Sequence, residues 1–106
     1  MSKYLLKVSY TLDGIRGVKA NGGSARRQAA EEAVRSVGGS LESFYFAFGD
    51  DDVYTIVDLP DNAAALAVSL AVCAGGGADA KTVVLLTPEE ADVAAAREVG
   101  YRPPGA

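Results

Sequence analysis

Histidine is absent from this sequence of 106 residues, and cysteine occurs once, as Cys73. Histidine is the commonest general base and the commonest metal ligand in proteins, so its absence excludes Ser-His-Asp and Cys-His nucleophile systems within one chain. A single cysteine excludes an internal disulfide and a thiolate zinc cage. Because Cys73 lies among alanines and valines, we expect a small buried side chain rather than a reactive thiol. We therefore expect neither a bound metal nor a cofactor.

Long apolar runs and an excess of positive charge are also lacking. Ten basic residues against fourteen acidic ones give a net charge of −4, which cannot build the broad positive surface that nucleic acids require. No window approaches the roughly 20 apolar residues of a membrane span. Residues 1–8 are too short an apolar run for a signal peptide and are interrupted by lysine. We expect a cytoplasmic protein that binds neither nucleic acid nor membrane.

Apolar spacing and turn residues predict the element order β-α-β-β-α-β, followed by one more helix. Strands are expected over residues 3–10, 40–48, 53–59 and 81–86, and helices over residues 24–37, 61–74 and 88–99. Residues 11–14 look like a turn or a short helical step. The sharpest local signal is Thr87-Pro88-Glu89-Glu90, which combines an N-cap, a proline at the first helical position and a glutamate at the third.

This order predicts an α+β, ferredoxin-like domain over residues 1–99, with a flexible tail over residues 100–106. Two right-handed β-α-β crossovers joined by a hairpin give a four-stranded antiparallel sheet with helices on one face. Alternation predicts large apolar side chains on both faces of the sheet. One face is expected to carry Tyr4, Leu6, Val8 and Tyr45, and the other face Leu5, Phe44, Phe46 and Ile56. A monomer would leave one set exposed, so we expect a homodimer or a higher oligomer. Residues 88–99 are expected either to seal a sheet edge or to cross onto the partner.

Several blocks of the sequence resemble the GYD domain family. They are Gly22-Gly23-Ser24-Ala25-Arg26-Arg27, Phe44-Tyr45-Phe46-Ala47-Phe48-Gly49, Asp52-Val53 and Asp58-Leu59-Pro60-Asp61. The resemblance covers residues 1 to about 92 and implies a ferredoxin-like fold that pairs as a dimeric α/β barrel. The Gly-x-Tyr-Asp element of the family corresponds to residues 49–52, where Asp51 stands in place of the tyrosine.

Two groups of residues are candidates for binding a ligand. Ser24, Arg26 and Arg27 open a helix and could hold a phosphate or carboxylate, or they could form an ordinary helix start in which Arg27 pairs with Glu31. Polar residues on otherwise apolar strands could line a small-molecule site, or they could be hydrogen-bonded groups in a packed interface. These are Lys7, Ser9, Tyr45, Tyr54 and Asp58.

The third candidate is the acidic run at residues 50–52. Adjacent carboxylates could bind a cation or transfer a proton, but a solvated hairpin tip explains them more simply. Asp52 is the best site residue of the three, since it matches the family element.

These features predict a dimeric small-molecule-binding or stress-associated accessory protein, whose partners are a second copy of itself and a small organic ligand. One alternative is a small metal-free enzyme of isomerase, cyclase or oxygenase type, with a pocket between the sheet and the helices or the partner. Another alternative is a protein-interaction or structural domain. No arrangement of residues in the sequence identifies a catalytic group.

Overall fold

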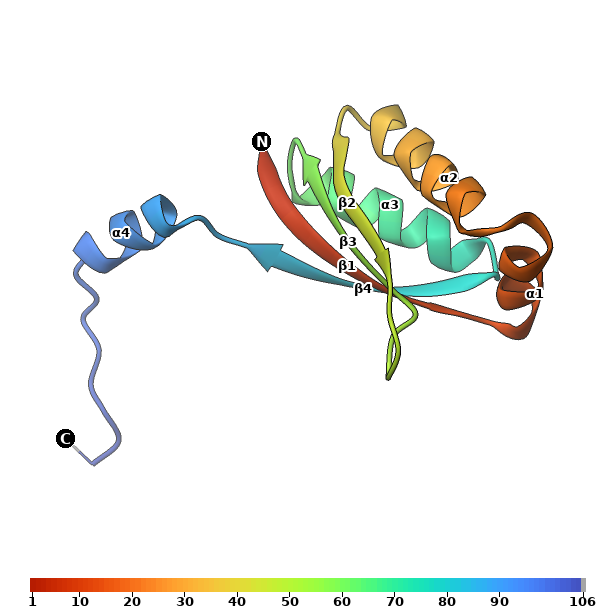
Figure 1. Ribbon diagram of the computed structural model, residues 1–106. Coiled ribbons are helices and arrows are strands. Elements are labelled where there is room, and N and C mark those ends of the chain that lie inside the picture. The colour runs from red at the N-terminus through yellow and green to blue at the C-terminus, as the bar shows by residue number, and fades with distance from the viewer. Residues whose placement is uncertain (106) are drawn as a thin grey trace.

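A mixed fold with one sheet is seen in the computed structural model, which describes residues 1–105 (Figure 1). The strands are β1 (Ser2–Tyr10), β2 (Ser40–Phe46), β3 (Val53–Leu59) and β4 (Ala78–Leu85). The helices are α1 (Leu12–Asn21), α2 (Gly23–Ser36), α3 (Asn62–Ala74) and α4 (Pro88–Ala96). The four strands pair antiparallel in the order β2-β3-β1-β4. The predicted α+β class and four-stranded antiparallel sheet are confirmed, and the strand order is compatible with a ferredoxin-like arrangement.

The helix starts follow the predicted capping signals. The Asp61 carboxylate accepts a hydrogen bond from the backbone N–H of Ala64 at 2.8 Å, which caps α3. At α4, Thr87 and Glu90 form a complete capping box, in which each side chain accepts from the other residue's backbone N–H. Predicted and observed element ends differ by a few residues, most at the start of β4, residue 78 rather than 81, and at the end of α4, residue 96 rather than 99.

Helix α1 extends beyond the turn or short helical step predicted at residues 11–14. Its two internal glycines are poor helix formers, so the sequence alone favours a loop. The side chain of Thr11 stabilises the start of the helix. Its hydroxyl accepts a hydrogen bond from the N–H of Gly14 at 3.2 Å and donates one to the carbonyl of Gly76, in the turn after α3, at 2.9 Å. A methyl group at Gly14 would overlap the carbonyl oxygen of Gly77. Close contact with the turn after α3 therefore requires glycine at position 14.

The core lies between α2, α3 and one face of the sheet. Its members are at most 6% exposed: Tyr4, Leu6, Val34, Val57, Leu59, Ala65 and Val68. The Tyr4 hydroxyl donates to the side-chain oxygen of Asn62 at 2.7 Å, so its polar end is satisfied where the ring is buried. These contacts fix α3 against the centre of the sheet.

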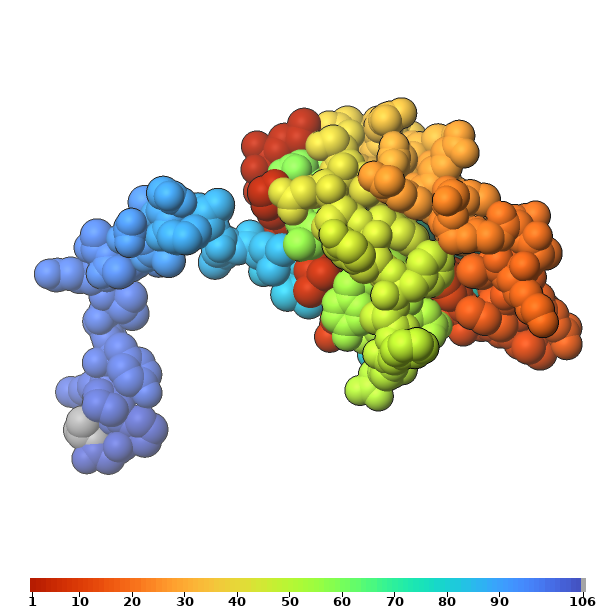
Figure 2. All heavy atoms as spheres, viewed as in Figure 1, coloured from red at the N-terminus to blue at the C-terminus, as the bar shows by residue number. Residues whose placement is uncertain are grey.

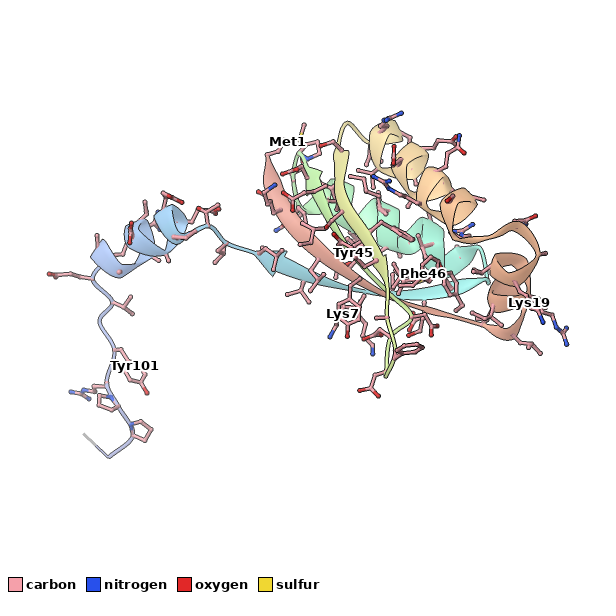
Figure 3. The ribbon with its side chains drawn as sticks, in the orientation of Figure 1. Met1, Lys7, Lys19, Tyr45, Phe46 and Tyr101 are labelled. Atoms are coloured by element: carbon pink, nitrogen blue, oxygen red, sulfur yellow. The ribbon has the colours of Figure 1, made fainter. Side chains whose placement is uncertain are left out.

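Strand register corrects the predicted division of the two faces. Phe44 and Leu6 both pair with Thr55, so Phe44 shares the helix-covered face with Tyr4, Leu6 and Val8. Tyr45 pairs with Tyr54 and lies on the opposite, open face with Leu5 and Ile56. Figure 3 shows Phe46 toward the helix layer and Lys7 on the other side of the sheet. A register shift between Leu41 and Ser43 changes the alternation within β2, which a simple period of two does not anticipate.

The outer side of α3 also differs from expectation. Cys73 is exposed, so the prediction that it is buried is wrong, and its thiol lies 3.5 Å from a carboxylate oxygen of Asp79. Leu66 and Leu70 are 59% and 61% exposed. Only Ala65 and Val68 of this helix are buried, because α3 is a surface helix whose outward residues are themselves apolar.

Helix α4 projects away from the sheet and does not seal a sheet edge of its own chain (Figures 1 and 2). Residues 88–105 are exposed throughout. The radius of gyration is 16.9 Å, whereas a compact chain of this length would have about 13 Å. The expected flexibility of residues 100–106 stays a prediction, and residue 106 lies outside the described residues. No helix within residues 1–105 is long and apolar enough to cross a membrane.

Candidate functional site

A partly open apolar cavity of about 100 Å³ lies between α2, α3 and the covered face of the sheet, and two of the residues that line it, Arg26 and Ala33, are exposed. On the helix side it is lined by three alanines of α2, Ala29, Ala30 and Ala33. On the sheet side it is lined by apolar residues that include Leu6 and Phe44. Alanine has the shortest side chain that still favours a helix, so this face of α2 leaves unfilled space where larger residues would reach the sheet. The cavity therefore results from the three alanines on this face of α2.

A second hollow of about 370 Å³ adjoins the cavity at the end formed by α1 and the turn after α3. Its lining is more polar and includes Asp13 and Asn21. The backbone N–H of Thr11 donates to the carbonyl of Gly77 at 3.0 Å, which holds the start of α1 against this turn. Three residues line both spaces: Arg26, Val72 and Ala78. An apolar chamber and a polar vestibule thus lie side by side.

Arg26 and Arg27, adjacent in sequence, have different surroundings. Arg26 lines both the cavity and the vestibule. Arg27 forms an ion pair with Glu31, with Nε and Oε1 3.4 Å apart, as predicted for an ordinary helix start. Glu31 also pairs with Arg35 at 3.2 Å. Ser24 is exposed, and neither space includes it in its lining. Of the predicted helix-start site, the structure brings only Arg26 to the cavity.

A row of four residues crosses the open face of the sheet. Register places Tyr45, Tyr54, Lys7 and Lys81 opposite one another on β2, β3, β1 and β4. Tyr45 is 70% exposed and Tyr54 is 37% exposed. The structure therefore brings together three of the predicted site residues, Lys7, Tyr45 and Tyr54, but on the face away from the cavity. Lys81 completes the row, and the sequence did not single it out.

Asp58 belongs to a separate ionic cluster at the other end of the open face. The Lys3 ammonium lies 3.0 Å from Asp58 and 2.8 Å from Glu42. The hydrogen bonds that the ammonium donates to Glu42 and then to Asp58 raise the pKa of Lys3 above its ordinary value of 10.5. Since Lys3 neutralises Asp58, a structural role for this carboxylate fits the geometry better than ligand binding.

Comparison with known proteins identifies one family. The family model of the GYD domain matches residues 4–95. The chain belongs to the GYD domain family. The resemblance inferred from the sequence blocks is thereby confirmed. No curated protein and no solved structure matches the chain.

The loop of this GYD domain at residues 49–52 is ordered by its aspartates. Gly49 has a φ of 105°, a left-handed conformation that favours glycine. A carboxylate oxygen of Asp52 accepts from the backbone N–H of Tyr10 at 2.8 Å. Asp52 therefore fixes the hairpin to β1.

Asp51 replaces the expected tyrosine and is 3% exposed, so the predicted solvated tip is wrong at this position. Its carboxylate accepts from the Ser9 hydroxyl at 3.1 Å and lies 3.9 Å from the Lys81 ammonium. The Asp51 carboxylate thus connects the hairpin to both β1 and β4. Ser9, which the sequence predicted as a site residue, makes a structural contact with it. Within residues 1–105 no group of three or more potential metal ligands gathers.

Sequence reasoning missed the residues that shape the cavity. The alanines of α2 indicate a packing face, which is their usual role, and only the distance from this helix to the sheet reveals the space. Asp13 and Asn21 were missed because α1 was not predicted as a helix. Their signal would have been Thr11 three residues before Gly14, a possible capping position.

Proposed function

We propose that this GYD-domain protein is a dimeric small-molecule-binding protein whose ligand occupies the cavity beneath α2. The observation that carries the proposal is the apolar cavity joined to a polar vestibule at Arg26. Protein interiors are close-packed, and an unfilled apolar space loses contacts and costs stability. A ligand that fills it recovers those contacts. Ligand sites are typically apolar with a few polar groups that set orientation.

The lining favours a binding protein over the enzyme alternative. Arg26 is the only residue of the cavity's lining with a charged side chain, and an arginine does not act as a general base; the other ionisable side chain of the lining is the phenol of Tyr10. The carboxylates near the sheet lie elsewhere: Asp51 is held by Ser9, and Asp58 by Lys3. No carboxylate lines the cavity, which favours binding over acid-base catalysis. The stress association stays a prediction.

The cavity is tested with isoamyl alcohol, a neutral molecule with a branched apolar tail. Methyl NMR spectra are recorded during the titration. Shifts are expected at methyl groups that line the cavity, such as those of Ala30, Val34 and Val68, and not at Leu5 or Ile56 on the open face. Saturable shifts at the first set support the proposal. Absence of such shifts up to the solubility limit of the alcohol would overturn it.

The dimer is proposed to form through the open face, in the ferredoxin-like, dimeric α/β-barrel arrangement. This face carries Leu5, Ile56, Tyr45 and Tyr54, and no helix of residues 1–105 covers it. A twofold axis parallel to the strands would place β2 over β4 and β3 over β1 of the second copy. The tyrosines of the cross-strand row would then face lysines of the same row, a pairing that cation–π attraction favours.

Helix α4 supports the same assembly. It has nine residues and a complete capping box, yet isolated helices of this length are marginal in water without a packing surface. Its exposed apolar residues include Val93, at 59%, and the preceding Leu86, at 69%. We propose that the arm formed by residues 86–97 packs on the second copy. Of the two roles expected for this segment, sealing a sheet edge or crossing onto the partner, this is the second.

Sedimentation equilibrium of two matched variants tests the dimer. Ile56→Lys places a charge at the centre of the open face and is expected to give a monomer. Leu66→Lys places the same charge on the outer side of α3 and is expected to leave the dimer intact. Truncation after Thr87 is expected to weaken the dimer and lower the thermal midpoint. A wild-type monomer at all concentrations would contradict the dimer, and an unchanged truncated dimer would contradict the role of the arm.

A further inference from the structure

Arg26 occupies the one position where a charged group borders the cavity and the vestibule together. A ligand whose apolar tail fills the cavity and whose other end lies in the vestibule would place that end near Arg26, which is itself exposed. Asp13 lines the vestibule but not the cavity. Arginine binds carboxylates in a planar, two-pronged geometry, which neutral groups cannot match. The position of Arg26 therefore bears on the charge of the ligand.

The electrostatics around Arg26 also favour an anion. Among residues 1–105, Arg26 has no carboxylate within 4.0 Å, whereas Arg27 and Arg35 both pair with Glu31. Arg26 lies near the start of α2, whose first turn contains no acidic residue and whose N-cap, Gly22, offers no side-chain hydrogen bond. The positive end of a helix disfavours a cation and favours an anion. A bound carboxylate would relieve this unfavourable arrangement.

The size of the cavity limits the apolar part of the ligand. Cavities of about 150 Å³ lined by apolar side chains are known to hold benzene. A cavity of about 100 Å³ therefore suits a smaller group, such as a branched alkyl chain. The adjoining vestibule of about 370 Å³ leaves room for the polar end and for solvent.

We infer that the ligand is a small organic carboxylate with a branched or compact apolar tail, and that Arg26 is the residue that selects its negative charge. This inference rests on the proposed function and names the ligand class of the same site. The tail lies among Ala29, Ala30 and Ala33, and the carboxylate lies at the junction with the vestibule.

Isovalerate and isovaleramide provide the test, because they have the same tail and differ in charge. Affinities are measured by methyl NMR titration of the full-length protein. Isovalerate is expected to bind about tenfold or more tightly than isovaleramide, as for a hydrogen bond to a charged group. Arg26→Gln is expected to remove this preference, so that isovalerate and isovaleramide bind with equal affinity. Arg27→Gln, the matched control, is expected to keep it.

The possible outcomes separate the inference from the function. Equal affinities of the wild type for isovalerate and isovaleramide would overturn the inference, and so would a preference for isovalerate that survives Arg26→Gln. In either case, shifts with isoamyl alcohol would still support binding of a small molecule in the cavity. Loss of the preference in both arginine variants would overturn the specific role of Arg26 and indicate a general field effect. Failure of isoamyl alcohol as well as both other probes would overturn the proposed function itself. Native spectra of each variant show whether it is folded.

Discussion

Filling the cavity by mutation should stabilise the protein and abolish ligand binding. Ala30 lines the cavity on α2, and Ala30→Leu would direct a branched side chain into it. Leucine adds three carbon atoms, each contributing about 0.8 kcal/mol when buried. Ordering the side chain costs about 0.5–1 kcal/mol. The expected net gain in the free energy of unfolding is about 1–2 kcal/mol.

Thermal and chemical unfolding measure this gain. In a domain of this size, 1 kcal/mol corresponds to a shift in Tm of about 4–8 °C, so the expected rise in Tm is about 4–16 °C. Ala25→Leu is the matched control, since Ala25 is exposed on the same helix and its side chain borders neither space. That variant should change the free energy of unfolding by no more than about 0.5 kcal/mol.

The same two variants also show whether the cavity exists. In a fully packed interior, leucine at position 30 would overfill the space and cost about 1–3 kcal/mol. A lower Tm for Ala30→Leu than for Ala25→Leu would therefore contradict the described packing. Unchanged isoamyl alcohol binding in Ala30→Leu would show that the probe binds elsewhere.

Two further predictions concern charged groups. Asp51→Ala should lower the free energy of unfolding by about 1–3 kcal/mol, because it leaves the groups around a buried carboxylate without a partner. Asp50 is exposed, so Asp50→Ala should change the free energy of unfolding by no more than about 0.5 kcal/mol. Urea unfolding measures both values, and equal effects would contradict the burial of Asp51. The pKa of Lys3 is raised by Glu42 and Asp58, so its stabilising contribution is complete below the unfolded value of 10.5 and is lost as pH rises through the folded value. The difference in stability between wild type and Lys3→Gln should therefore shrink at strongly alkaline pH, and a constant difference from neutral to strongly alkaline pH would contradict the ionic cluster.

The elements that carry strong local signals were predictable from sequence. Asp61 and Thr87 start helices because their side chains satisfy free backbone N–H groups, an interaction confined to one turn. The hairpin between β2 and β3 follows from two apolar runs around an acidic, glycine-containing turn. Local chemistry of this kind needs no knowledge of the rest of the chain.

Features that depend on distant parts of the chain were not predictable. Helix α1 is stabilised by contacts of Thr11 and Gly14 with residues 76 and 77, far along the sequence. The bulge in β2 shifts which side chains face the helices, so alternation assigned Phe44 to the wrong face. Asp51 is buried because Ser9 and Lys81 converge on it from two strands.

The candidate site was predicted only in part. Arg26 was singled out from its position at a helix start, and the structure places it at the cavity. Lys7, Tyr45 and Tyr54 do gather, but on the open face, because register and not composition decides which strand residues meet. The cavity itself is a difference between the space available and the side-chain volume that fills it. Such a difference requires the distance between helix and sheet, which no local pattern contains.

The proposed ligand, a small organic carboxylate, binds between α2 and the covered face of the sheet. This location is tested by intermolecular nuclear Overhauser effects between the methyl groups of isovalerate and those of the protein. Binding in the cavity predicts effects to Ala30, Val34 and Val68, which line it. Effects confined to Leu5 and Ile56, on the open face, would contradict it.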